Sequence, residues 1–155
     1  MSYYSNLKSH PNKRLEEHLL NVAENCENFC KNLSIKDKNL YTQISFFIGL
    51  SHDFAKSTSF FQKYLLNGEK SKYRYHGFLS AVFGYYVIKN YLKENNISHE
   101  LDLSVLSYLV IVKHHGDLSN VSGSNGEWYK VSSNDASFGG KQLKDIEKNV
   151  ENDNG

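Results

Sequence analysis

A chain of 155 residues with 39% hydrophobic and 23% charged residues can bury one core and has the composition of an ordinary globular domain. The formal net charge of +1 excludes a surface that attracts polyanions as a whole, so nucleic-acid binding would need a local basic patch. No leader segment stands out, and no apolar run reaches the roughly 18 residues of a membrane span, so we expect one cytoplasmic domain over residues 1–155 with no membrane contact.

Helical periodicity begins early in the chain. Apolar residues spaced three and four apart predict an amphipathic helix from about Asn12 to Leu33, with His18 on or beside its apolar face. A second helix is expected from about Asp37 through LYTQISFFIGLSHDFA, and its apolar second half should be central in the fold. The only two cysteines, Cys26 and Cys30, lie one turn apart, and we interpret them as reduced thiols packed on a helix face.

The next helices are separated by polar turns. Ser57 or Thr58 is a candidate N-cap for a short helix, SFFQKYLL, which should end at Asn67-Gly68. A long helix, GFLSAVFGYYVIKNYLKEN, is predicted to begin near His76 and to end in the polar run at residues 93–96. A further helix carries LDLSVLSYLVIVKHH up to Gly116, where a glycine can end it.

The periodic pattern then disappears. Residues 119–140 are rich in Gly, Ser and Asn and are predicted to form a long loop, and residues 141–155 are predicted to start a charged helix. No alternating strand pattern and no repeat stands out. We therefore expect an all-α domain with a helical core over about residues 12–118.

Metal-type ligands stand at or near the ends of these predicted helices: His18, His52, Asp53, His76, His114 and His115. Consecutive residues on a helix diverge by about 100°, so an adjacent pair serves one centre only at a helix end or where two metals lie side by side. Polar pairs at the ends of apolar helices are costly unless something pairs them. Nitrogen and oxygen ligands together suit divalent Mn, Ni, Co, Fe, Mg or Zn.

Each of these residues has a simpler interpretation when it is taken alone. His18 and His76 would then be surface or hydrogen-bonded histidines, and Lys56 either a solvated charge at a helix end or a phosphate contact. His10 and His99 are assigned to the surface.

The order of these residues resembles the HD phosphohydrolase superfamily, which is named for its histidine-aspartate pair. LSHDFAKSTSFFQKYL resembles the HD-x-x-K segment, followed by Phe-Gln and an aliphatic residue, of the HD nuclease of type I CRISPR interference systems. HGFLSAVFG resembles the next motif of that family, and VKHHGDL resembles its double-histidine motif. The match spans about Leu15 to Leu118 and implies an HD-domain helical bundle with a metal site at its centre.

The resemblance also implies a chemistry. Two divalent ions would share Asp53, one held also by His18 and His52, and the other by His76, His114 and His115. The implied activity is metal-dependent endo- or exonucleolytic cleavage of single-stranded DNA in antiviral defence, with Asp53 and Lys56 as catalytic residues. The implied partners are a CRISPR helicase subunit and an RNA-guided surveillance complex.

One feature of the family pattern is not matched. The family has a further aspartate on a helix well after the double histidine, and neither Asp117 nor Asp135 can be assigned to that role. We therefore expect that the 155 residues are the N-terminal part of a longer nuclease domain, with a weakly held first metal and reduced activity.

A basic and aromatic segment precedes His76. NGEKSKYRYHG interleaves Lys70, Lys72 and Arg74 with two tyrosines, which predicts binding of a single strand through charge and stacking, although a solvated loop is the alternative. Trp128 and Tyr129 are candidates for stacking groups or for anchors of the long loop. Two other functions stay open, namely hydrolysis of nucleotides or cyclic dinucleotides, and a non-catalytic helical module that binds metal or a protein.

Overall fold

Helices make up most of the structure, a computed structural model that describes residues 6–99, 102–114 and 137–153. The α-helices are α1 (Leu15–Lys31), α2 (Lys38–Ser51), α3 (Ser59–Asn67), α4 (Gly77–Glu94), α5 (Leu103–Lys113) and α6 (Phe138–Asp153). The short 3₁₀ helices η2 (Phe54–Ser57) and η3 (Lys72–Arg74) precede α3 and α4, and a small antiparallel hairpin, β1 (Lys8–His10) and β2 (Lys13–Arg14), precedes α1. The predicted all-α class is confirmed.

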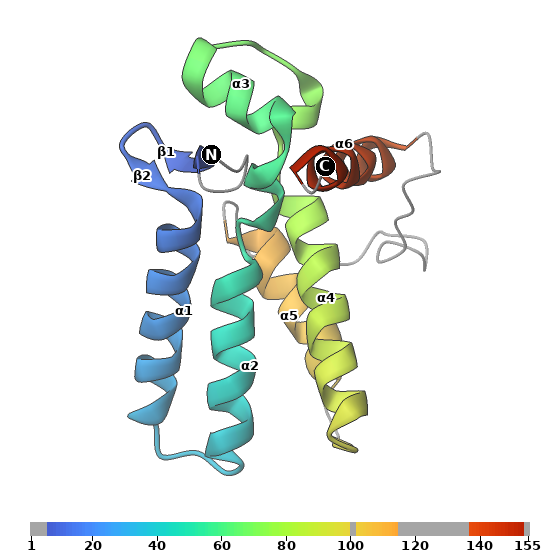
Figure 1. The fold of residues 1–155 in the computed structure, drawn as a ribbon. Coiled ribbons are helices and arrows are strands. Elements are labelled where there is room, and N and C mark those ends of the chain that lie inside the picture. Colours follow the sequence, from blue (N-terminus) through green and yellow to red (C-terminus); the bar gives the residue numbers. More distant parts are fainter. Residues whose placement is uncertain (1–5, 100–101, 115–136, 154–155) are drawn as a thin grey trace.

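The long helices form a bundle whose members alternate in direction (Figure 1). The helices α1 and α4 begin at the end of the bundle that carries α3, whereas α2 and α5 finish there. The helix α6 lies across this same end, beside the start of α4. Side chains from the first turns of α1 and α4 and the last turns of α2 and α5 are therefore brought close together.

The core packs mainly between α2, α4 and α5. One cluster contains Ala81, Val82, Tyr85, Tyr108 and Ile111, and a second contains Ile44, Ile88 and Leu103. A third, smaller cluster joins Ala55 and Leu79 to Ile146 of α6. Burial of these apolar side chains is the main force that holds the helices together, at about 1.5–3 kcal/mol for each large side chain.

A glycine permits unusually close contact between α1 and α2. A Cβ atom on Gly49 would lie 2.6 Å from the Cα of Ala23 and 2.9 Å from its backbone nitrogen, so no larger residue fits there without a shift of backbone. Backbones in direct contact place the two helices side by side at a fixed separation.

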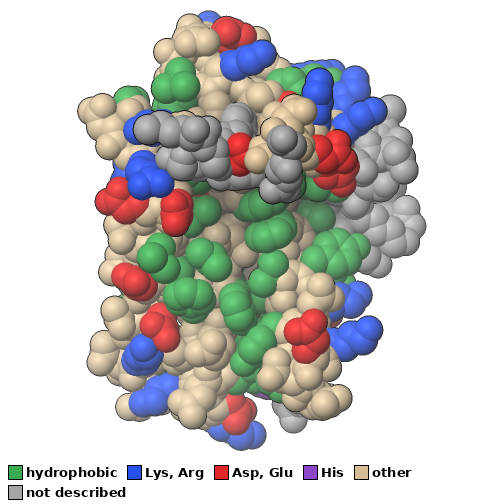
Figure 2. All heavy atoms as spheres, viewed as in Figure 1, with side chains coloured by type: hydrophobic (Ala, Val, Ile, Leu, Met, Phe, Trp, Pro, Cys, Tyr) green, Lys and Arg blue, Asp and Glu red, His purple; other side chains and the backbone are tan. Residues whose placement is uncertain are grey.

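An apolar groove runs between α1, the end of α2 and α6. It has a volume of about 740 Å³ and is lined by side chains that include Leu15, Leu19, Leu50, Phe54, Ile146 and Val150. Figure 2 shows hydrophobic side chains gathered on this face of the molecule. None of the helices in the described ranges has the length and apolar character needed to cross a bilayer.

Two predicted boundaries are wrong. The hairpin at residues 8–14 occupies the start of what was expected to be a helix from Asn12, because strands of two and three residues are too short to show alternation. The helix α6 begins at Phe138, inside the predicted loop over 119–140, and runs for 16 residues rather than only starting at 141. Residues 115–136, which make up most of that loop, lie outside the described part of the chain.

Candidate metal centre

Four helix ends supply the histidines of the centre. His18 lies in the first turn of α1, His52 is the C-cap of α2, His76 is the N-cap of α4, and His114 is the C-cap of α5. Asp53 follows His52 directly and is the N-cap of η2. Because the helix has already ended at this point, the adjacent His52 and Asp53 can face the same centre, as the sequence predicted.

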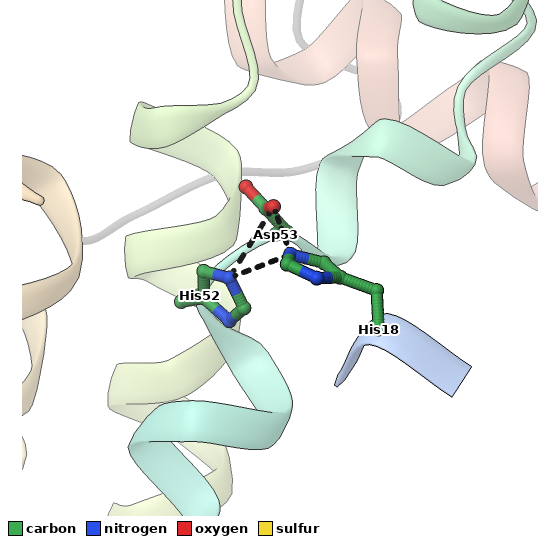
Figure 3. Close-up of side chains that lie close together, drawn as sticks. All are labelled: His18, His52 and Asp53. Carbon is green, nitrogen blue, oxygen red and sulfur yellow. Dashed lines mark hydrogen bonds and ion pairs between the residues drawn. The ribbon is translucent and has the colours of Figure 1, made fainter. Parts of the chain in front are cut away.

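The carboxylate of Asp53 is the shared element of the centre and is only 2% exposed. Its Oδ2 atom lies 2.9 Å from Nε2 of His18 and 3.3 Å from Nε2 of His52 (Figure 3). Its Oδ1 atom lies 3.1 Å from Nε2 of His76 and 3.4 Å from Nε2 of His114. We call the first group the Oδ2 side and the second the Oδ1 side, because each carboxylate oxygen faces its own pair of imidazoles.

Backbone carbonyls orient two of the imidazoles. Nδ1 of His52 lies 2.6 Å from the carbonyl oxygen of Gly49, and Nδ1 of His114 bonds in the same way to the carbonyl of Ile111. A carbonyl only accepts, so Nδ1 carries the proton and Nε2 of a neutral ring presents its lone pair to the centre. This is the tautomer that a metal ligand needs.

Lys56 is buried beside the carboxylate. Its Nζ atom lies 2.8 Å from Oδ2 of Asp53 and donates to the carbonyl of Ser9 at 3.4 Å, and the residue is 5% exposed. The turn of η2 explains the pairing, since residues three apart in a 3₁₀ helix lie one above the other. The interpretation of Lys56 as a solvated helix-end charge is therefore wrong.

Burial and hydrogen bonding compete in setting the pKa values of the centre. Burial disfavours the charged form of Asp53, but hydrogen bonds from His114, His52 and His76 in their protonated forms, and from Lys56, outweigh it and hold the pKa far below its ordinary value. Burial lowers the pKa of His18 despite the neighbouring carboxylate. For His114, the bonds to Asp53 and to the Ile111 carbonyl outweigh burial and raise the pKa. The carboxylate is thus ionised, as a metal ligand must be.

The cluster fits a metal ion. The candidate ligand atoms of His18, His52 and Asp53 lie within 4.8 Å of one another, and so do those of Asp53, His76 and His114. Imidazole nitrogen and carboxylate oxygen suit divalent transition metals. The structure therefore brings together every predicted ligand among the described residues, while His115, Asp117, Asp135, Trp128 and Tyr129 lie outside them.

Two buried glutamines hold the backbone on either side of the centre. Gln62 donates to the carbonyls of Lys8 and Lys56 at 2.8 and 2.7 Å. Gln142, on α6 and 0% exposed, donates to the carbonyls of Tyr73 and Tyr75, each at 2.7 Å. The Tyr75 carbonyl belongs to the peptide group that links to His76, so Gln142 restrains the segment that positions this ligand.

The helix α6 also binds the start of α3. The carboxylate of Asp145 accepts from the backbone nitrogen of Ser59 at 2.6 Å and from its hydroxyl at 2.5 Å. Thr58 is the N-cap of α3, which confirms one of the two predicted candidates. Sequence reasoning missed the roles of Gln142 and Asp145, whose partners lie more than 65 residues away.

The remaining predicted assignments have mixed outcomes. His10 is exposed, as expected, whereas His99 is half-buried with its ring nitrogen 3.3 Å from the hydroxyl of Tyr41, so its surface assignment is wrong. Cys26 is half-buried and Cys30 buried, and both are free thiols, which confirms their interpretation as packed, reduced residues. Lys70 and Lys72 are exposed and Arg74 is half-buried, on or just before η3.

No protein-family model matches the chain, and neither a curated protein nor a solved structure shows significant similarity to it.

Proposed function

We propose that the protein is a metal-dependent phosphodiesterase of the HD type that cleaves single-stranded DNA. The observation that carries the proposal is the shared carboxylate, in which each oxygen of buried Asp53 faces a separate pair of imidazoles. A bridging carboxylate with a nitrogen ligand set on either side suits a pair of divalent ions, drawn from Mn, Ni, Co, Fe, Mg or Zn.

The residues of the centre have distinct tasks. When bound, two divalent ions supply an activated water and stabilise the charge on the attacking and leaving oxygens of a phosphodiester. Asp53 keeps its negative charge and spans both sides, and the carbonyls of Gly49 and Ile111 fix the orientation of His52 and His114. Lys56 adds a buried positive charge next to Asp53 and so contributes to the field that attracts a phosphate.

The substrate and partners are inferred from the motif resemblance and from the basic segment before His76. Single-stranded DNA as substrate, and a CRISPR helicase subunit with an RNA-guided surveillance complex as partners, belong to this proposal. Hydrolysis of nucleotides or cyclic dinucleotides and a non-catalytic metal-binding module are the competing functions.

A nuclease assay across the six divalent metals tests the proposal. We expect the metal-loaded protein to degrade a long single-stranded DNA, and Asp53→Asn to abolish both degradation and metal uptake measured by elemental analysis. Asp37→Asn is the matched control, because it makes the same change at a carboxylate that is 44% exposed and lies at the start of α2, at the opposite end of that helix from His52. Hydrolysis of nucleotides without cleavage of DNA would favour the first competing function, and metal uptake with no hydrolysis of any phosphodiester would favour the second.

A further inference from the structure

Cations from two distant segments meet around one tyrosine ring at the α3–α6 end of the molecule. Nζ of Lys141, on α6, donates to the hydroxyl of Tyr73 at 3.1 Å and lies 5.4 Å from the centre of its ring. Nζ of Lys72, on η3, lies 5.3 Å from the same ring centre. Tyr73 and Lys141 are 68 residues apart in sequence, so tertiary structure rather than a lysine-rich turn assembles this cluster.

A third cation is held between two further tyrosines. The guanidinium carbon of Arg74 lies 4.9 Å from the ring centre of Tyr64 and 4.6 Å from that of Tyr75. The same group donates to the Tyr75 hydroxyl at 3.0 Å and to the carbonyl of Ser71 at 3.2 Å. Tyr75 is 60% and Tyr64 40% exposed, so both rings present area to solvent. Arg74 is thus fixed in place beside exposed aromatic surface.

In the part of the chain that the structure describes, these three cations form no ion pair with a carboxylate. Among the described residues, none of the ion pairs within 4.0 Å involves Lys72, Arg74 or Lys141, whereas the exposed Arg14 and Lys31 each pair with a glutamate. Asp145, one turn after Lys141, accepts instead from Ser59. Figure 2 shows Lys and Arg side chains gathered at this end of the molecule.

We propose that Tyr64, Lys72, Arg74, Tyr75 and Lys141 form a binding surface for single-stranded nucleic acid, which we call the η3–α6 surface. Cations held on aromatic rings that are partly exposed match the way proteins contact phosphates and stack bases of a single strand. Lys70, predicted together with Lys72 and Arg74, is exposed and takes part in none of these ring contacts. The inference rests on the proposed function for its biological meaning. It adds Lys141 and Tyr64 to the residues that the sequence predicted to bind a single strand.

The surface is joined directly to the metal centre. Tyr75 immediately precedes His76, and Gln142, next to Lys141, binds the backbone carbonyls of Tyr73 and Tyr75. A strand bound along the η3–α6 surface therefore lies next to the segment that leads into the Oδ1 side.

Binding measured without metal tests the surface independently of catalysis. We would measure the fluorescence anisotropy of a labelled oligothymidylate with wild-type protein in EDTA, over a series of salt concentrations. Lys141→Ala should weaken binding and lower the slope of log K against log salt by about 0.7, the value for one lost phosphate contact on a single strand. Tyr75→Ala should weaken binding roughly 5- to 150-fold with an unchanged slope, because stacking releases no counterions.

Lys93→Ala is the matched control, since it removes one exposed lysine from the last turn of α4, at the opposite end of the bundle. If Lys141→Ala and Lys93→Ala bound the oligothymidylate equally well, the proposed role of the η3–α6 surface would be wrong. It would also be wrong if the protein bound duplex DNA more tightly than the single strand and Tyr75→Ala had no effect on binding. Hydrolysis of a small chromogenic phosphodiester by metal-loaded wild-type protein is measured in parallel. If the protein did not hydrolyse this phosphodiester, the result would count against the proposed function. The binding assay in EDTA would still show whether the η3–α6 surface binds a single strand.

Discussion

The two sides of the Asp53 carboxylate share a ligand but differ in the charges around it. On the Oδ2 side, Nε2 of His18 and Nε2 of His52 are 3.2 Å apart, and the ammonium of Lys56 lies 2.8 Å from the oxygen. On the Oδ1 side, His76 and His114 face the oxygen, and Gln142 restrains the backbone before His76. The Oδ2 side therefore already contains a protein cation.

This difference predicts unequal affinities for metal. Two unit charges about 4 Å apart interact by roughly 4 kcal/mol at an effective dielectric constant of 20, so an ammonium next to Oδ2 opposes the binding of a second cation there. We expect the Oδ1 side to bind its ion first. The expectation from sequence of a weakly held metal at His18, His52 and Asp53 agrees with this reasoning but remains a prediction.

The largest effect should come from removing the shared charge. Asp53→Asn abolishes the bridge, so we expect elemental analysis to find neither ion bound. The change also leaves the buried Lys56 without its ion-pair partner, which should lower the free energy of unfolding by roughly 3–5 kcal/mol in EDTA. Urea titration measures this loss of stability. If Asp53→Asn retained both ions, Asp53 would not be a ligand common to the two sides.

Removing the ammonium group of Lys56 should make the metal affinities of the two sides more alike. In calorimetric titration with Mn²⁺, Lys56→Met should strengthen the weaker binding step by about tenfold or more, because the repulsion from the ammonium disappears. Two further variants assign the binding steps to the two sides. We expect His76→Ala to remove the tighter binding step and His18→Ala to remove the weaker one. Lys63→Met, at an exposed lysine of α3, is the control. Weakening of both steps by Lys56→Met would show that the lysine supports metal binding instead.

Removing the backbone restraint should affect one side only. Gln142→Met removes two hydrogen bonds to carbonyls, which should lower the free energy of unfolding by about 2 kcal/mol and weaken the step assigned to the Oδ1 side by up to about tenfold. Gln62→Met removes two hydrogen bonds to carbonyls on the other side, at Lys8 and Lys56, together with the bond that Gln62 accepts from the backbone nitrogen of Lys8. Identical metal-titration curves for Gln142→Met and Gln62→Met would contradict the division of the centre into an Oδ1 and an Oδ2 side. Gln43→Met, at an exposed site on α2, controls for the effect of a glutamine-to-methionine change.

The smallest effect concerns the cap of the helix that carries His114. The carboxylate of Asp102 accepts from the backbone nitrogens of Ser104 and Val105, both at 3.1 Å, so Asp102→Ala should cost about 1 kcal/mol at neutral pH. Burial opposes ionisation of Asp102, but bonds from Ser104 and Val105 prevail and lower its pKa below the ordinary value of 3.8.

The contribution of this cap is therefore complete above pH 3.8 and is lost as the pH falls through the lower folded-state value. Urea titrations of wild type and Asp102→Ala at several pH values should converge in acid. A difference that stayed constant with pH would mean that packing rather than the charged cap is responsible.

Sequence reasoning found the ligands because their signal is local. His52-Asp53 follows an apolar helix directly, and the alternation of helix directions brings His18, His76 and His114 to the same end. Gln142 and Lys141 could not be found in this way, because a glutamine or a lysine in a charged helix has no distinctive pattern until its partners, 67 to 69 residues away, are known. The start of α6 at Phe138 was missed because two glycines follow, which weaken a helical signal although both are buried against the fold.

The contact of Gly49 with the backbone of Ala23 has a consequence for the choice of ion. His18 lies less than two turns from Ala23, and His52 follows Gly49 by three residues, so the gap between their imidazoles depends on how closely the two backbones approach. A single added methyl group at position 49 would widen that gap without altering any ligand. Gly49 can thus influence which metal ion fits the centre by radius, although it does not contact the ion.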